Sequence, residues 1–251
     1  MTDASATLSA VDVSTARSVP RAATAVGCAV ATKGAVARSL GLSRSALEAN
    51  GFSGKPGQVL AVPSGDGLAV AVGVGDPGSI DANGLRSAAA AFARAASKHA
   101  HLATNLADVD GVDAKAAGQA VAEGVLLASY RYVGLKNDES VGSKLESLTL
   151  MVGEKRQKGV DQGAERGAVV AAAAAFAREL ANTPPTYLNA KDIAAKAVDI
   201  GSASGLHVEV FNKDELEQMG CGGALCRRFW LGQICRRCRL GRLWHLLRNR
   251  R

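Results

Sequence analysis

The sequence has no apolar run long enough to cross a bilayer. The longest, Ala168 to Ala177, spans ten residues and is mostly alanine, about half of the roughly 20 residues that a transmembrane helix needs. The amino terminus lacks a basic segment followed by strong hydrophobes and carries Asp3 and Asp12, so neither a secretory signal nor a transit peptide is visible. We therefore expect a cytoplasmic protein without a membrane span.

Acidic residues and lysine are missing from the segment 225–251. This segment has nine arginines and a formal charge of +9, whereas the whole chain has +7. Residues 1–224 therefore carry −2. The positive net charge of the whole chain is thus no evidence for a nucleic-acid-binding surface on the folded body. The arginines can contact phosphates, and Trp230 and Trp244 can stack on bases. We therefore predict weak and nonspecific binding of nucleic acid by the tail.

Alanine and valine are also missing from this tail, although it holds three of the five cysteines. Together with Cys221, they read Cys-x4-Cys-x8-Cys-x2-Cys, which four thiolates around zinc would allow. The spacing is irregular, and only Cys235 and Cys238 make a Cys-x-x-Cys pair. We therefore favour no metal site here.

The body of the chain alternates short β-prone runs with helical patterns, which predicts a largely parallel or mixed sheet covered by helices. The expected strands are Ala25–Ala31, Gln58–Val62, Leu68–Val74 and Leu145–Val152. The expected helices are Ser43–Ala49, Leu85–Lys98, Ala114–Tyr130 and Ala164–Leu180. Residues 1–20 form a loosely held terminus in this prediction, with at most a short strand near Leu8 to Val13.

A second α/β region is predicted after the polar stretch Gly153 to Gly163, which we interpret as a domain boundary. The alanine-rich helix that follows must end before Pro184 and Pro185, because proline lacks a backbone donor and restricts its predecessor. Asn189 can cap a new helix that ends at Gly205. A strand over 206–211 and a helix over 213–219 complete the pattern, which begins a domain and does not finish it.

Several motifs have a functional and a structural interpretation. Gly73 to Gly78 matches Gly-x-Gly-x-x-Gly, but the helix and acidic residue of a dinucleotide site do not follow, so a strand-to-loop turn is favoured. His99 and His101 suggest surface residues at a helix end rather than a metal site. Asp108, Asp110 and Asp113 suggest a loop and a helix cap. Glu123 suggests a structural ion pair with Arg131 or Lys115.

Four runs resemble the leucyl (cytosol) aminopeptidase family. Gly51-Phe-Ser-Gly-Lys-Pro-Gly-Gln58, Val72-Gly-Val-Gly-Asp76 and Glu123-Gly-Val-Leu-Leu-Ala-Ser-Tyr-Arg-Tyr132 are similar to its amino-terminal domain. The run Ala177-Arg-Glu-Leu-Ala-Asn-Thr-Pro-Pro-Thr-Tyr-Leu188 and the segment through Gly223 look like the start of its catalytic domain. The resemblance covers roughly residues 20 to 223.

The resemblance implies a macro-domain-like amino-terminal domain over 21–160, a linker helix and the beginning of a catalytic domain over 161–224, and an aberrant tail over 225–251. It implies a family that removes amino-terminal residues, preferably leucine, from peptides with two divalent ions, manganese or zinc, and that assembles as a hexamer. The family's ligand run Asn-Thr-Asp-Ala-Glu-Gly-Arg-Leu does not occur in the sequence. We therefore expect no catalytic, cofactor-binding or metal-binding residue in this chain, and no activity of the chain alone.

A reading-frame shift near Ala224 accounts for the tail, because out-of-frame reading of a GC-rich gene enriches Arg, Cys and Trp and depletes Ala, Val and acids. A downstream gene without aminopeptidase coding in another frame would contradict this hypothesis. The alternative function is a non-catalytic oligomerisation or nucleic-acid-binding module. In either case we expect residues 20–160 to form the cooperative unit and residues after Pro184 to be protease-sensitive.

Overall fold

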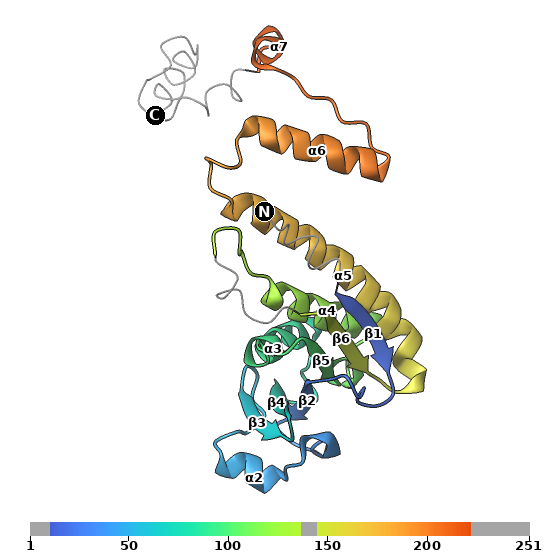
Figure 1. The fold of residues 1–251 in the computed structure, drawn as a ribbon. Coiled ribbons are helices and arrows are strands. Elements are labelled where there is room, and N and C mark those ends of the chain that lie inside the picture. The colour runs from blue at the N-terminus through green and yellow to red at the C-terminus, as the bar shows by residue number, and fades with distance from the viewer. Residues whose placement is uncertain (1–10, 137–144, 222–251) are drawn as a thin grey trace, which may run out of the picture. The chain divides into compact units, whose positions relative to one another are not determined.

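A computed structural model describes residues 11–136 and 145–221 of the chain (Figure 1). The chain divides into two compact units, one ending at Pro184 and the other beginning at Pro185. In the described ranges, no helix has both the length and the apolar character that a membrane span requires. Each unit is described below by itself.

The first unit is built on a six-stranded mixed sheet with the order β1-β6-β5-β2-β4-β3. All neighbouring strands run parallel except β3, which pairs antiparallel with β4 at one edge. The strands are β1 (Asp12–Ala16), β2 (Ala25–Ala31), β3 (Val59–Ser64), β4 (Gly67–Gly75), β5 (His101–Thr104) and β6 (Ser147–Met151). This architecture confirms the predicted mixed sheet.

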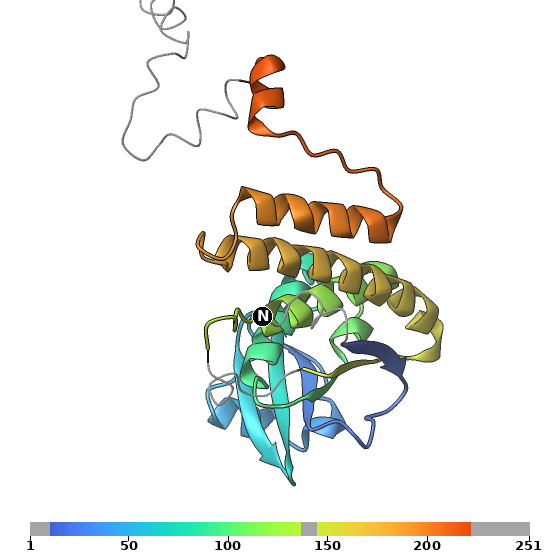
Figure 2. The same cartoon turned by 45° about the horizontal axis from the view of Figure 1, so that its top comes forward.

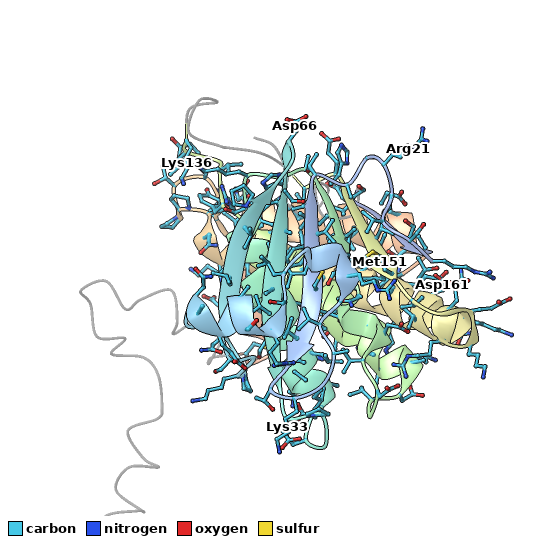
Figure 3. The ribbon with its side chains drawn as sticks, turned by 90° about the horizontal axis from the view of Figure 1, so that it is seen from below. Arg21, Lys33, Asp66, Lys136, Met151 and Asp161 are labelled. Carbon is cyan, nitrogen blue, oxygen red and sulfur yellow. The ribbon has the colours of Figure 1, made fainter. Side chains whose placement is uncertain are left out.

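Helices cover both faces of the sheet (Figure 1 and Figure 3). One face carries α3 (Ala82–Ala95), α4 (Ala114–Ser129) and α5 (Glu154–Asn182). Helix α5 lies beside α4 in both Figure 1 and Figure 2. The other face carries the short helices η1 (Arg38–Leu40) and α2 (Arg44–Ala49). A further short helix, η2 (Leu106–Asp108), follows β5.

Strand β4 shows how the sequence pattern produces these layers. Successive side chains of a strand point to opposite faces. Val70 and Val72 accordingly belong to the large core under α3 and α4, while Ala69 and Ala71 belong to the smaller core with Leu47 of α2. The run is apolar on both sides because both faces of the strand are buried.

Helix α5 begins at Glu154, well before Ala164, where the sequence places its start. The stretch 153–163, which the sequence suggested as a domain boundary, lies at the start of this helix and within the first unit. Two of its glycines, Gly159 and Gly163, are weak helix formers in isolation but make close contact with α4. A Cβ atom on Gly163 would collide with the backbone of Lys115 and Gln119, and a Cβ atom on Gly118 would collide with the backbone of Val160.

The amino-terminal segment is more ordered than the sequence indicates. Residues 12–16 form the edge strand β1, which pairs with β6 in the register Asp12 with Ser147 through Ala16 with Met151. The side chain of Gln157 in α5 also donates to Thr15 Oγ1 at 3.1 Å. These residues are therefore part of the sheet, although the sequence places residues 1–20 in a loose terminus.

His101 lies in β5 and not at a helix end, so that interpretation is also wrong. Helix α3 ends at Ala95, and His101 starts the strand between β2 and β6. Its Nδ1 atom is 3.0 Å from Ser147 Oγ on β6. The four residues His-Leu-Ala-Thr are too few to show an alternation that a sequence pattern can detect.

The second unit contains helices α6 (Ala190–Ser204) and α7 (Lys213–Gln218). Asn189 and Asp192 form the predicted capping arrangement at the start of α6, and Gly205 ends the helix with a φ of 68°. Residues 206–211, predicted as a strand, have no strand structure. Leu206, Val210 and Phe211 are exposed there, which is the state of a β-prone segment without a pairing partner.

We predict that the substitution Gly163→Ala destabilises the first unit by about 1–3 kcal/mol, the usual cost of overpacking. In a helix interior, alanine is normally more stabilising than glycine by about 1 kcal/mol. The collision with α4 must therefore outweigh this gain for the substitution to be destabilising. Urea unfolding followed by far-ultraviolet circular dichroism measures the change.

Gly78→Ala is the matched control. The added methyl group would lie 3.7 Å from Asp76 Oδ1, an ordinary contact, and Gly78 is outside the left-handed region. We expect a change within about 0.5 kcal/mol. Equal midpoints for wild type and Gly163→Ala would show that α4 and α5 are not packed as closely as described.

Candidate functional site

A hollow of the first unit lies where parallel strands end. Because β1, β5 and β6 are parallel, their carboxyl ends meet at one edge of the sheet, which is where α/β proteins commonly bind ligands. A cavity of about 620 Å³ opens there, and Met151, labelled in Figure 3, is at this edge. It is lined by Arg17, Ser18, Val19, Ser39, Asn105, Asp108, Met151, Val152, Gly153 and Glu154.

The polar groups of this cavity mostly bind one another. Asn105 Oδ1 accepts from the backbone nitrogen of Ala29 at 2.7 Å. Asp108 Oδ1 accepts from the backbone nitrogen of Gly153 at 3.2 Å. At the rim, Arg17 and Glu154 form an ion pair of 3.0 Å between two exposed side chains. These bonds therefore join the ends of β1, β2, β5 and β6 around the cavity.

Cys28 lies beneath this edge with its Sγ atom 3.2 Å from Ser39 Oγ. Burial raises the pKa of the thiol, and the hydrogen bond with Ser39 lowers it by less. The thiol is therefore protonated at neutral pH, and the thiolate is the nucleophilic form of cysteine. Cys28 acts here as a small core residue.

Glu123 is a buried acid with two partners. Its Oε2 atom accepts from Arg86 Nε at 2.7 Å, and its Oε1 atom accepts from Gln119 Nε2 at 2.7 Å. Arg86 also donates to Asn83 Oδ1. The predicted ion pair is thus present, but its partner is Arg86 of α3 and neither of the two residues that the sequence suggested.

Glu179 is the second buried acid, near the end of α5. The hydroxyl of Tyr130 donates to Glu179 Oε2 at 3.1 Å and accepts from Asn182 Nδ2 at 3.1 Å. Arg178 donates to the carbonyl oxygen of Leu127 at 3.1 Å. This cluster joins the carboxyl ends of α4 and α5.

The other motifs adopt the structural roles favoured from the sequence. Asp113 caps α4 by accepting from the backbone nitrogen of Ala116. The Gly73 to Gly78 run is the end of β4 and a turn, and α3 begins only at Ala82. Of the four cysteines considered for zinc, Cys226, Cys235 and Cys238 lie outside the described residues.

The donor atoms of the described residues do not fit a two-metal centre. In the ranges 11–136 and 145–221, no three His, Cys, Asp or Glu side chains are grouped as metal ligands. The two buried glutamates already bind Arg86 and Tyr130, and a bridging carboxylate must be free to hold metal ions.

Comparison with known proteins gives a consistent match over the first unit. Residues 26–139 match the model described as cytosol aminopeptidase family, N-terminal domain. The probable cytosol aminopeptidase of Rhodococcus opacus (strain B4) is 36% identical over 187 residues, which cover 71% of this chain and 36% of that protein. The chain contains the amino-terminal domain of the cytosol aminopeptidase family.

Another family member, the probable cytosol aminopeptidase of Mycobacterium leprae (strain TN), is 33% identical over 183 residues. These residues cover 72% of this chain and 34% of that protein. The chain therefore spans about a third of the length of the relatives it matches.

Solved structures agree with the cytosol aminopeptidase fold. The bottromycin maturation enzyme BotP has a TM-score of 0.65 and 32% identity, covering 80% of this chain and 42% of BotP. A mutant of tomato leucine aminopeptidase has a TM-score of 0.71, covering 84% of this chain and 46% of that one. At 21% identity, the tomato enzyme supports the fold alone.

The runs that resemble the cytosol aminopeptidases meet in pairs in the structure. The 51–58 loop binds β4, because Gly75 N donates to the Gly54 oxygen and Gly73 N donates to the Gln58 oxygen, each at 2.9 Å. The 123–132 and 177–188 runs meet at Tyr130 and Glu179. These contacts all lie within the first unit.

We predict that Glu123→Ala lowers the free energy of unfolding by about 2 kcal/mol. Breaking a buried pair costs roughly 3–5 kcal/mol, and Arg86, whose side chain is 35% exposed, recovers part of this by hydration. The double variant Arg86→Met with Glu123→Leu should recover most of the loss, since an apolar pair leaves no charge unpaired.

Urea unfolding of the single and double variants measures this effect. Glu165→Ala, at an exposed position of α5, is the control and should stay within about 0.5 kcal/mol of wild type. A double variant less stable than Glu123→Ala would contradict the assignment of the loss to the unpaired arginine.

Proposed function

We propose that this chain provides the amino-terminal, non-catalytic domain of a metal-dependent aminopeptidase of the cytosol family. The identity of 36% over 187 residues to a probable cytosol aminopeptidase carries this proposal. The family implies removal of amino-terminal residues, preferably leucine, from peptides, with two divalent ions in the catalytic domain. A solved structure of BotP is described as a complex with Mn, which supports manganese as the first ion to test.

The described side chains support a non-catalytic role for this domain. Its buried acids are bound to Arg86, Gln119 and Tyr130, and its buried cysteine is protonated. We propose that the chain alone does not hydrolyse peptides, that it works in the cytoplasm and that it contributes to a homo-oligomer. The composition of the segment 225–251 supports a shift of reading frame near Ala224.

The direct test is hydrolysis of leucine-p-nitroanilide by the purified chain with added manganese or zinc, alongside a calorimetric titration of each metal. We expect no turnover and no tight metal binding. The chain is produced in a host that lacks its own leucyl aminopeptidase. Turnover that persists after repurification would contradict a non-catalytic domain. A full-length family member, assayed in parallel, shows that the conditions support the reaction.

A second function, nucleic-acid binding, is favoured by the nine arginines of the segment 225–251. Phosphate contacts release counterions, so such binding must weaken steeply as salt increases. Fluorescence anisotropy with a labelled single-stranded DNA should show weak binding at low salt that is lost at physiological salt. Replacing Arg227, Arg228, Arg236 and Arg237 by Ser should reduce the salt dependence. Tight binding at physiological salt would instead support a nucleic-acid-binding module.

A further inference from the structure

The carboxyl end of α5 is held by a group of side chains that the peptidase proposal does not use. We call Tyr130, Arg178, Glu179 and Asn182 the junction cluster. The hydroxyl of Tyr130 is its centre, because it donates to Glu179 Oε2 and accepts from Asn182 Nδ2, each at 3.1 Å. Glu179 is 9% exposed, so its carboxylate depends on this protein partner more than on water.

The phenol of Tyr130 is suited to this bridging position. Burial raises its pKa, and the nearby Glu179 contributes in the same direction, although the hydrogen bond from Asn182 lowers it. The phenol is therefore protonated at neutral pH and can donate to the carboxylate. It directly follows Ser129, the last residue of α4, so the bridge joins the ends of two helices.

Arg178 adds two contacts on the same side of α5. Its Nη1 atom donates to the carbonyl oxygen of Leu127 at 3.1 Å, a carbonyl in the last turn of α4 that has no partner within the helix. Its guanidinium carbon lies 5.8 Å from the centre of the Tyr130 ring, within the range of a cation–π contact. Arg178 thus binds both the backbone and the ring at the end of α4.

The chain beyond the cluster changes direction at once. Thr183 follows the last residue of α5, and its backbone nitrogen and its hydroxyl both donate to the backbone carbonyl oxygen of Glu179, at 3.0 and 2.7 Å. Pro184 closes the first unit and Pro185 begins the second. A helix end without tertiary contacts frays, and fraying here would move the point at which the chain leaves the first unit.

We infer that the junction cluster is a positioning device that keeps the last turns of α5 folded against α4 and so fixes where the chain passes into the second unit. The inference is independent of peptidase activity. The 123–132 and 177–188 runs each supply one side of the cluster.

Hydrogen exchange of the full chain, followed by mass spectrometry, tests the inference with the substitution Tyr130→Phe. This variant removes both hydroxyl bonds and keeps the ring beside Arg178. We expect amides of residues 176–183 to exchange roughly tenfold faster, the loss typical of a hydrogen bond to a charged group. Amides of β2, β5 and β6 should exchange at the wild-type rate. Unchanged exchange in 176–183, or an equal acceleration throughout the sheet, would overturn the inference.

Tyr132→Phe is the matched control. The hydroxyl of Tyr132 is buried and has no hydrogen-bond partner in the part of the chain that the structure describes. Its removal should leave exchange in 176–183 unchanged. An acceleration as large as that of Tyr130→Phe would show that any tyrosine substitution loosens this region, and would overturn the assignment to the junction cluster.

Conservative rescue separates the hydrogen bond from general packing. Glu179→Gln keeps an acceptor oxygen for Tyr130 and should preserve slow exchange, whereas Glu179→Ala should match Tyr130→Phe. Trypsin gives an independent measurement, because Arg178 lies in the cluster and Lys191 lies in α6. We expect faster cleavage after Arg178 in Tyr130→Phe and an unchanged rate after Lys191. Equal behaviour of Glu179→Gln and Glu179→Ala would contradict a hydrogen-bonded cluster.

Discussion

The close contact between α4 and α5 is the constraint on which the first unit depends. Glycines on both helices leave no room for a Cβ atom, so backbone meets backbone at Gly118 and Gly163. This contact places α5 over α4, and both helices bury apolar residues in the core that also contains the sheet. Ala117, Val121 and Val160, for example, are fully buried there. Close approach of the two helices thus lets many small residues form a dense layer.

The same contact determines the geometry at both ends of α5. Its amino end reaches the cavity at the carboxyl edge of the sheet, where Gly153 binds Asp108. Its carboxyl end reaches Tyr130, which lies just beyond α4. From Glu154 to Glu179, the 1.5 Å rise per residue gives a separation of roughly 38 Å. The cavity and the junction cluster are therefore at opposite ends of one helix.

Local patterns allowed much of this fold to be predicted from the sequence. The apolar run of β4 and the cap at Asn189 depend on neighbouring residues, and the structure confirms both. The start of α5 could not be predicted in this way, since Gly163 is favourable in a helix only when α4 lies against it. The partner of Glu123 was missed for a similar reason, because Arg86 is 37 residues away on a different helix.

Function shows the same contrast between motifs that can be seen in the sequence and contacts that only the structure reveals. The runs over 123–132 and 177–188 were recognisable by resemblance, but their meeting at Tyr130 requires the three-dimensional arrangement. Once they are placed together, their polar residues bind one another across the ends of two helices. These contacts lie within the first unit, at the end from which the chain continues into the second unit.

Limited proteolysis of the full chain with mass-spectrometric mapping tests the central claim most directly, namely that α5 belongs to the first unit through its contact with α4. The account predicts early cleavage in the exposed stretch between Pro184 and Asn189 and a resistant fragment that retains α5 through Asn182. Early cleavage within the stretch 153–163 would contradict it, because that result would place a flexible boundary where the structure has a helix packed on α4.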